Sequence, residues 1–218
     1  PHLPRTFAKS VNLINKEVNQ SVIQFGHLGI DRLNPDYFKI MMMNAILGGS
    51  SVSRLYDQIR EQRGLAYGVF SYFTLSADTG MFIVDTSTKN ESVAQVISII
   101  LAEIKNMQAD LVNEEELKNT KEGTLNGFVF RFENPVRVVE QYMYIEHIGL
   151  PDNYLATYRD NIMKVTREDI RAAAQKYLKP DDYILLVVGD SKKFDKPLSE
   201  FGPVNEIKLE NPKAKEEK

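Results

Sequence analysis

The stretch that decides the fold spans residues 47–72 and reads LGGSSVSRLYDQIREQRGLAYGVFSY. A hydroxyl at Ser50 or Ser51, just after two glycines, can cap a helix by accepting a backbone amide hydrogen of its first turn. Gly64 offers the left-handed conformation that ends helices, and residues 65–73 are aromatic and β-branched enough to form a strand. The stretch therefore predicts a short helix that stops sharply and continues as a strand.

Two polar residues flank this joint: Arg60 in the last helical turn and Tyr67 near the start of the strand. Both side chains donate hydrogen bonds from stiff groups, a planar fork and a phenol, so together they can grip a carbonyl oxygen. A structural role is the alternative, in which Arg60 pairs with carbonyls at the helix end and Tyr67 packs on the sheet. The residues alone leave both roles open.

The order of the expected elements indicates an α+β fold. A first strand or edge segment is expected around residues 6–13, and further strands over residues 17–30, 65–73, 81–88 and 183–189. Helices are expected over residues 36–47 and 93–104 and from Asn113, Asn134, Pro151 and Thr166. Residues 65–88 should form a hairpin with its turn at residues 78–80. The helix from Asn134 should end at Gly149, with an inward face made of Val138, Val139, Tyr142 and Ile145. We predict an antiparallel sheet with helices packed on one face.

The composition bounds the class of protein. Of the 218 residues, 43% are apolar and 26% are charged, which is enough for a real core in a soluble protein. The net charge of −3 argues against a nucleic-acid surface. The chain has no cysteines, which excludes disulfides, thiolate catalysis and Cys-based zinc sites. No apolar run approaches the roughly 20 residues that cross a bilayer, and the compartment stays open between cytoplasm and periplasm.

The domain organisation is inferred from the distribution of apolar residues, which become sparse towards the C-terminus. We expect a linker or edge segment over residues 1–14, a single α+β domain over residues 15–200 and a charged tail over residues 201–218. The first residues contain two prolines and no initiator methionine, as an interdomain linker does. We infer that the chain was cut or processed from a longer one.

The histidines do not predict a metal site. Zinc sites commonly take two ligands one helical turn apart, but His2, His27 and His147 are far from one another in the sequence. Residues 143–147 are one substitution from His-x-x-Glu-His, yet Met143 stands where the first imidazole would be, and a thioether is a poor zinc ligand. We therefore expect no metal bound by this chain and a structural or surface role for His27.

The stretch from the two glycines through Arg60 to Tyr67 closely resembles the second, non-zinc-binding domain of pitrilysin/insulinase-type zinc peptidases. The bacterial and mitochondrial processing-peptidase branch is the nearest match. The Gly-Gly-Ser sequence, together with an Arg and a Tyr seven positions apart, is fairly specific. Supporting similarity covers roughly residues 15–190, nearly the whole expected domain.

The resemblance implies a division of labour between two homologous α+β domains that face each other across a chamber. The first domain binds zinc through an inverted His-x-x-Glu-His motif, and the second supplies an Arg and a Tyr that bind substrate backbone. Arg60 and Tyr67 match that pair. The corresponding motif positions of this chain hold Ile40, Met43 and Asn44. This chain alone should therefore not hydrolyse peptides, and zinc is expected in the partner domain.

The expected function is thus the non-catalytic half of a zinc metalloendopeptidase that forms a peptide-binding chamber with its catalytic partner, in the same polypeptide or as a separate subunit. One alternative is a structural core-type subunit of a larger complex. Another is a small-molecule-binding α+β domain that presents the amides of residues 48–51 to an anion. That loop lacks the lysine of a phosphate-binding loop, so a capped turn is the favoured interpretation.

Overall fold

The computed structural model describes residues 8–74 and 79–209, with Asp78 of the expected hairpin turn outside the described part. The strands are β1 (Ser10–Asn15), β2 (Gln20–Leu28), β3 (Ala66–Phe73), β4 (Met81–Lys89), β5 (Ile184–Gly189) and β6 (Val204–Glu206). The α-helices are α1 (Tyr37–Leu47), α2 (Arg54–Tyr56), α3 (Val93–Ala109), α4 (Glu114–Val129), α5 (Pro135–Ile148), α6 (Tyr154–Lys164) and α7 (Arg167–Tyr177).

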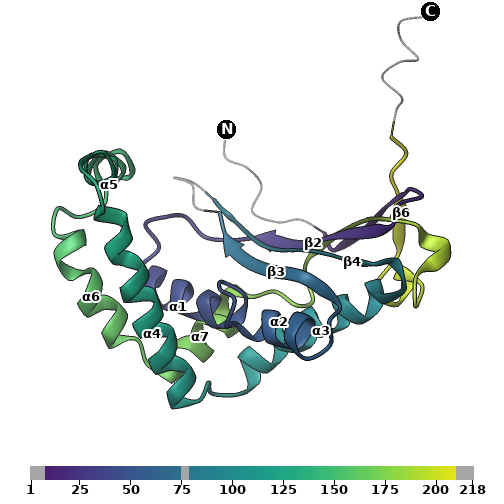
Figure 1. Cartoon of the computed structure of the whole chain (residues 1–218), viewed down its shortest axis with the longest axis horizontal. Helices are drawn as coiled ribbons and strands as arrows, with labels where there is room; N and C mark the ends of the chain where they lie inside the picture. The colour runs from purple at the N-terminus through teal and green to yellow at the C-terminus, as the bar shows by residue number, and fades with distance from the viewer. Residues whose placement is uncertain (1–7, 75–78, 210–218) are drawn as a thin grey trace, which may run out of the picture.

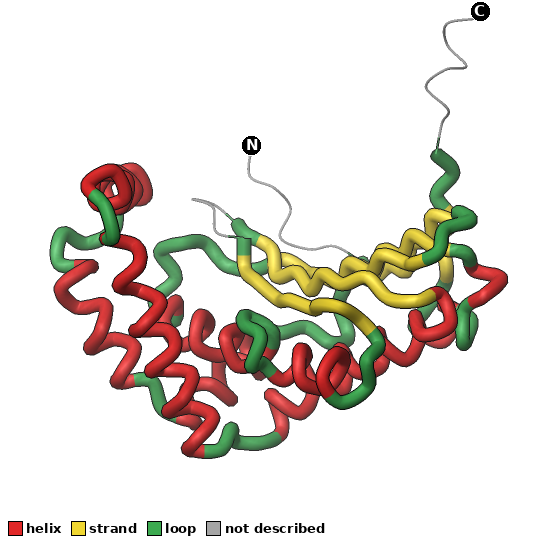
Figure 2. Tube along the Cα trace, in the orientation of Figure 1, coloured by secondary structure: helices red, strands yellow, loops and turns green. Residues whose placement is uncertain are grey.

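The strands form one six-stranded sheet in the order β3-β4-β2-β5-β1-β6. Strands β3, β4, β2 and β5 pair antiparallel, whereas β1 runs parallel to both β5 and β6. Figure 2 shows the helices gathered on one face of the sheet. The predicted α+β fold with helices on one face is confirmed. Residues 10–14, expected in a linker or edge segment, lie in β1, and residues 204–206, expected in the charged tail, form β6.

The core lies between the sheet and the helices. Along β4 the side chains alternate, so that Phe82 and Val84 are fully buried while Met81 is 49% exposed. Helix α3 presents a continuous apolar stripe to them, made of Val93, Val96, Ile97, Ile100 and Ile104. Thr166 caps α7 in a capping box with Asp169, as predicted for its start.

The other face of the sheet stays open among the described residues. Four large apolar side chains of the strands on this face are 39–46% exposed: Val22, Phe70, Tyr72 and Ile184. The Tyr72 hydroxyl donates a hydrogen bond of 2.7 Å to Asp85 on the neighbouring strand. An antiparallel sheet with one solvated face normally carries polar side chains there, so this apolar surface is unusual.

Helix α5 corrects one prediction. Of the four side chains expected to face inward, Ile145 is buried, but Val139 and Tyr142 are 56% and 59% exposed. The reason is the position of the helix: α4 and α6 form an arm beside the sheet, and α5 crosses its tip (Figure 1). The helix begins with Asn134 as its cap and ends at Gly149 with φ of 74°, as predicted.

His27 has a structural role, as the sequence indicated. Its ring is 4% exposed and stacks on Phe82 with 4.9 Å between ring centroids. Nδ1 lies 2.8 Å from the carbonyl oxygen of Leu28, and the backbone N–H of Lys179 donates to Nε2 at 3.2 Å. One nitrogen must donate and the other must accept, so the imidazole is neutral. Burial lowers the pKa of His27 below its ordinary value of 6.5.

The stability of the fold should therefore fall on mild acidification. A histidine with a lowered pKa favours the native state above the pKa of the unfolded chain, and that contribution is lost as the pH falls below about 6.5. We expect urea unfolding to show a decline of up to about 1.4 kcal/mol per pH unit from this group. The difference in the free energy of unfolding between wild type and His27→Gln should become smaller as the pH falls from 8 to 5. A gap that is constant with pH would contradict this role.

Candidate functional site

The joint between helix and strand forms as predicted, with one correction at its start. Ser53, and not Ser50 or Ser51, is the residue before α2, with extended backbone. Its hydroxyl donates to the carbonyl oxygen of Ser50 at 2.6 Å, so the serines first build a turn of their own. At the other end, Gly64 has φ of 60°, and its N–H donates to the Arg60 carbonyl at 2.9 Å. The predicted left-handed stop is confirmed.

Arg60 lies on a π-helical turn (η1, Asp57–Glu61) that continues α2. Such wide turns occur frequently at functional sites. The guanidinium donates to the hydroxyl of Tyr56, lies 5.0 Å from the centroid of that ring, and places Nε 3.6 Å from a carboxylate oxygen of Glu61. Its contacts among the described residues are thus side chains, and the side chain remains 42% exposed. Pairing with helix carbonyls is not what holds it.

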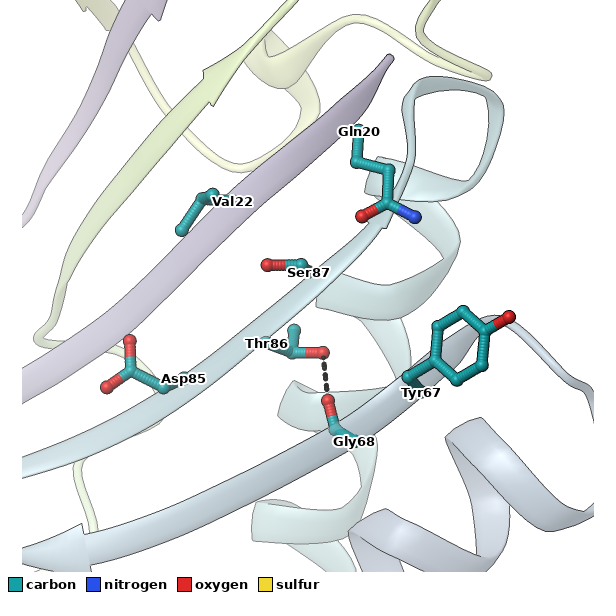
Figure 3. A pocket seen from close by; sticks show the side chains of 7 residues that line it. All are labelled: Gln20, Val22, Tyr67, Gly68, Asp85, Thr86 and Ser87. Carbon is teal, nitrogen blue, oxygen red and sulfur yellow. Dashed lines mark hydrogen bonds between the residues drawn. The ribbon is translucent and has the colours of Figure 1, made fainter. Parts of the chain in front are cut away.

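Tyr67 lies at a β-bulge. The register between β3 and β4 shifts between Ala66 and Val69, so two residues oppose one. Two threonines of β4 stabilise this irregular backbone: Thr86 donates to the Gly68 carbonyl at 2.8 Å, drawn in Figure 3, and Thr88 donates to the Leu65 carbonyl at 2.6 Å. The phenol projects from the strand and is 86% exposed. It therefore does not pack on the sheet.

Arg60 and Tyr67 line one hollow of ≈ 410 Å³. Its remaining walls come from the joint and from two strands: Gln20, Gly64, Leu65, Ala66, Ser87, Thr88 and Lys89. Tyr67 also borders a second hollow of ≈ 330 Å³ on the open face of the sheet, where Figure 3 shows Asp85 and Gln20. The structure thus brings the two predicted residues together on an accessible surface that has both polar and apolar walls.

Several residues of this surface were not found from the sequence. Gln20, Ser87 and Lys89 come from β2 and β4, which approach Tyr67 only through sheet pairing. The signal available was strand alternation, which places every second side chain on the open face. That signal predicts on which face of the sheet a side chain lies. It does not predict how β2 and β4 align beside β3, because this alignment depends on strand register.

Three hydrogen bonds connect strand β3 to the end of helix α1. Asn44 Nδ2 donates to the Ser71 carbonyl at 2.9 Å, the Ser71 hydroxyl donates to Asn44 Oδ1 at 2.8 Å, and the Ser71 N–H donates to the Gly48 carbonyl at 2.8 Å. A Cβ on Gly48 would lie 2.5 Å from the Ser71 hydroxyl oxygen, so only glycine fits there without a shift. The amides of Gly48 and Gly49 donate to Asn44, which leaves them committed within the turn.

The positions that match the catalytic motif hold core residues. Ile40 is 1% exposed and Met43 is fully buried, and Asn44 is bonded to Ser71 as described above. These side chains do not fit a zinc ion. Within residues 8–74 and 79–209, no group of three or more His, Cys, Asp or Glu side chains is placed to hold a metal ion. Nor does that part of the chain contain a helix of the length and apolar content needed to cross a membrane.

Comparisons with known proteins agree with this picture. The family profile described as the peptidase M16 inactive domain matches residues 1–124, more than half of the chain. The non-peptidase homolog YmxG of Helicobacter pylori is 30% identical over 199 residues, which cover 88% of this chain and 45% of that protein. An uncharacterized zinc protease YmxG of Bacillus subtilis is 32% identical over 107 residues, covering 49% of this chain and 26% of that protein.

The fold has a solved counterpart. The crystal structure of a peptidase M16 inactive domain from Pseudomonas fluorescens superposes with a TM-score of 0.78 at 27% identity, covering 84% of this chain and 44% of that one. In each of these comparisons the matched part is less than half of the other protein. The chain belongs to the peptidase M16 inactive-domain family.

Proposed function

We propose that this chain is the non-catalytic half of a zinc metalloendopeptidase and that Arg60 and Tyr67 contact the backbone of a bound peptide. The chamber for that peptide would be shared with a His-x-x-Glu-His domain, in the same polypeptide or as a separate subunit. Zinc and the residues that bind it would belong to that domain.

The observation that carries this proposal is the exposure of two hydrogen-bond donors over one hollow. Arg60 is held by Tyr56 and Glu61, so its position is fixed while part of its surface stays free. Tyr67 projects from a β-bulge and is 86% exposed, so packing among the described residues does not account for its position. Positioned donors that meet a carbonyl oxygen as it gains charge are a major source of catalytic stabilisation.

Two apolar surfaces supply places for the partner domain. One is the open face of the sheet with Val22, Phe70 and Ile184, and the other is the outer stripe of α5 with Val139 and Met143, which is 64% exposed. Large exposed apolar patches commonly mark protein interfaces. The matched relatives extend well beyond the part that resembles this chain, which is consistent with a second domain there.

The test is reconstitution. The chain and a purified His-x-x-Glu-His partner domain are incubated, separately and together, with a fluorogenic unfolded peptide. We expect cleavage in the mixture and none by this chain alone. A mixture that forms a complex and leaves the peptide intact would reject the proposal and favour a structural role. The name of the Helicobacter relative, a non-peptidase homolog, supports that second candidate.

A further inference from the structure

Arg32 is a buried cation for which the described residues provide no counterion. It follows β2 and is 3% exposed, and none of the ion pairs in the described part of the chain includes it. Tyrosines surround it instead: Nε donates to Tyr144 at 2.8 Å, Nη2 donates to Tyr154 at 2.9 Å, and the guanidinium carbon lies 3.7 Å from the ring centroid of Tyr37. Buried charges are normally paired.

The cluster has more donors than acceptors. A tyrosine hydroxyl that accepts from the guanidinium still has its own hydrogen to donate. The hydroxyls of Tyr144 and Tyr154 donate to no acceptor in the described part of the chain, and Arg32 Nη1 has no partner there either. A ligand that fits this cluster is therefore an acceptor with negative charge.

A cavity of ≈ 310 Å³ leads to this cluster. Arg32, Tyr37 and Tyr154 line it, and apolar side chains form further walls: Leu33, Pro35, Phe38, Leu150 and Pro151. It lies where the loop after β2 meets the turn between α5 and α6. Strands β2 and β3 run in the same direction because both are antiparallel to β4. The cavity is thus at the opposite end of the sheet from Tyr67.

We propose that this Arg32 cavity binds the carboxylate group of a small organic molecule or chain end. A single guanidinium balances a monoanion, whereas a phosphate dianion would keep an excess negative charge in a poorly solvated site. The carboxylate oxygens accept from Nη1 and from the Tyr154 hydroxyl, and the apolar walls contact an aromatic or aliphatic stem. This site is independent of the proposed peptidase function.

The test compares an acid with its neutral amide. N-acetyl-phenylalanine and N-acetyl-phenylalanine amide are titrated into the 218-residue chain by calorimetry, while the Arg32 Nε–H signal is followed by NMR. We expect the acid to bind at least 10-fold more tightly and to shift the Arg32 signal. Arg32→Gln should lose that preference. Arg159→Gln, a change of an exposed arginine on α6, should keep it.

Each contrary outcome is decisive. Equal affinity for acid and amide, or an acid preference without a shift of the Arg32 signal, would overturn the site. So would binding of inorganic phosphate in place of the acid. If Arg32→Gln does not fold, Tyr154→Phe removes one donor and leaves the guanidinium in place. That variant should bind the acid 3- to 10-fold more weakly, and an unchanged affinity would reject the cluster as the binding group.

Discussion

Replacing Arg60 by alanine is expected to lower the rate of peptide cleavage by the reconstituted enzyme about 100-fold, the effect typical of losing one positioned donor to a developing oxyanion. The variant should fold normally, because Arg60 is partly exposed and bonds only to Tyr56 and Glu61 among the described residues. The measurement is kcat for a fluorogenic peptide, made with saturating partner domain. Loss in kcat rather than in assembly identifies a contact with the substrate.

The chain offers a matched control for this change. Arg63 is an exposed arginine just after the same turn, and it donates to the carbonyl and side-chain oxygens of Gln58. Arg63→Ala should leave kcat within about twofold of wild type, since surface changes of this kind cost little. An Arg60→Ala enzyme as fast as wild type, or an Arg63→Ala enzyme as slow as Arg60→Ala, would remove Arg60 from the substrate site.

Truncating Phe82 to alanine is expected to cost about 3–5 kcal/mol of the free energy of unfolding. Phe82 is fully buried on the helix side of β4, with ring centroids 4.9 Å from His27 and 5.1 Å from Phe73. Its removal leaves a cavity that these rings cannot fill without moving. Urea unfolding of the 218-residue chain measures the loss, and the native secondary structure is checked by circular dichroism.

Phe70→Ala is the control for the two faces of the sheet. Phe70 lies on the neighbouring strand β3 and is 46% exposed, with its ring centroid 6.1 Å from that of Tyr56 on α2. We expect a loss below about 1 kcal/mol in the isolated chain, because little apolar area returns to water. If both variants lose similar stability, the assignment of a core face and an open face is wrong.

Local sequence signals were sufficient for many elements. The helix α3 follows from apolar residues at helical spacing, the starts of α5 and α7 from Asn134 and Thr166, and the sharp end of the helix before β3 from Gly64. These features depend on a few neighbouring residues, which is why they can be predicted. The family followed from the residues around the same joint.

Features that depend on contacts between residues far apart in the sequence could not be predicted from the sequence. The exposed stripe of α5 arises because α4 and α6 hold this helix away from the sheet. The parallel pairing of β1 requires β5 and β6, which come much later in the sequence. The Arg32 cluster joins tyrosines 112 and 122 positions away. No local sequence pattern predicts such a cluster. The hollow beside Arg60 and Tyr67 likewise depends on the register of β2 and β4.

The most direct test of the central claim places a photo-crosslinker at position 67. Tyr67→p-benzoylphenylalanine is prepared in the 218-residue chain, mixed with the partner domain and a labelled peptide, and irradiated. The control carries the same group in place of Lys105, an exposed residue on α3. We predict a peptide adduct at position 67 that requires the partner domain, and none at position 105. Peptide cleavage without an adduct at position 67, or equal labelling at both positions, would contradict the account.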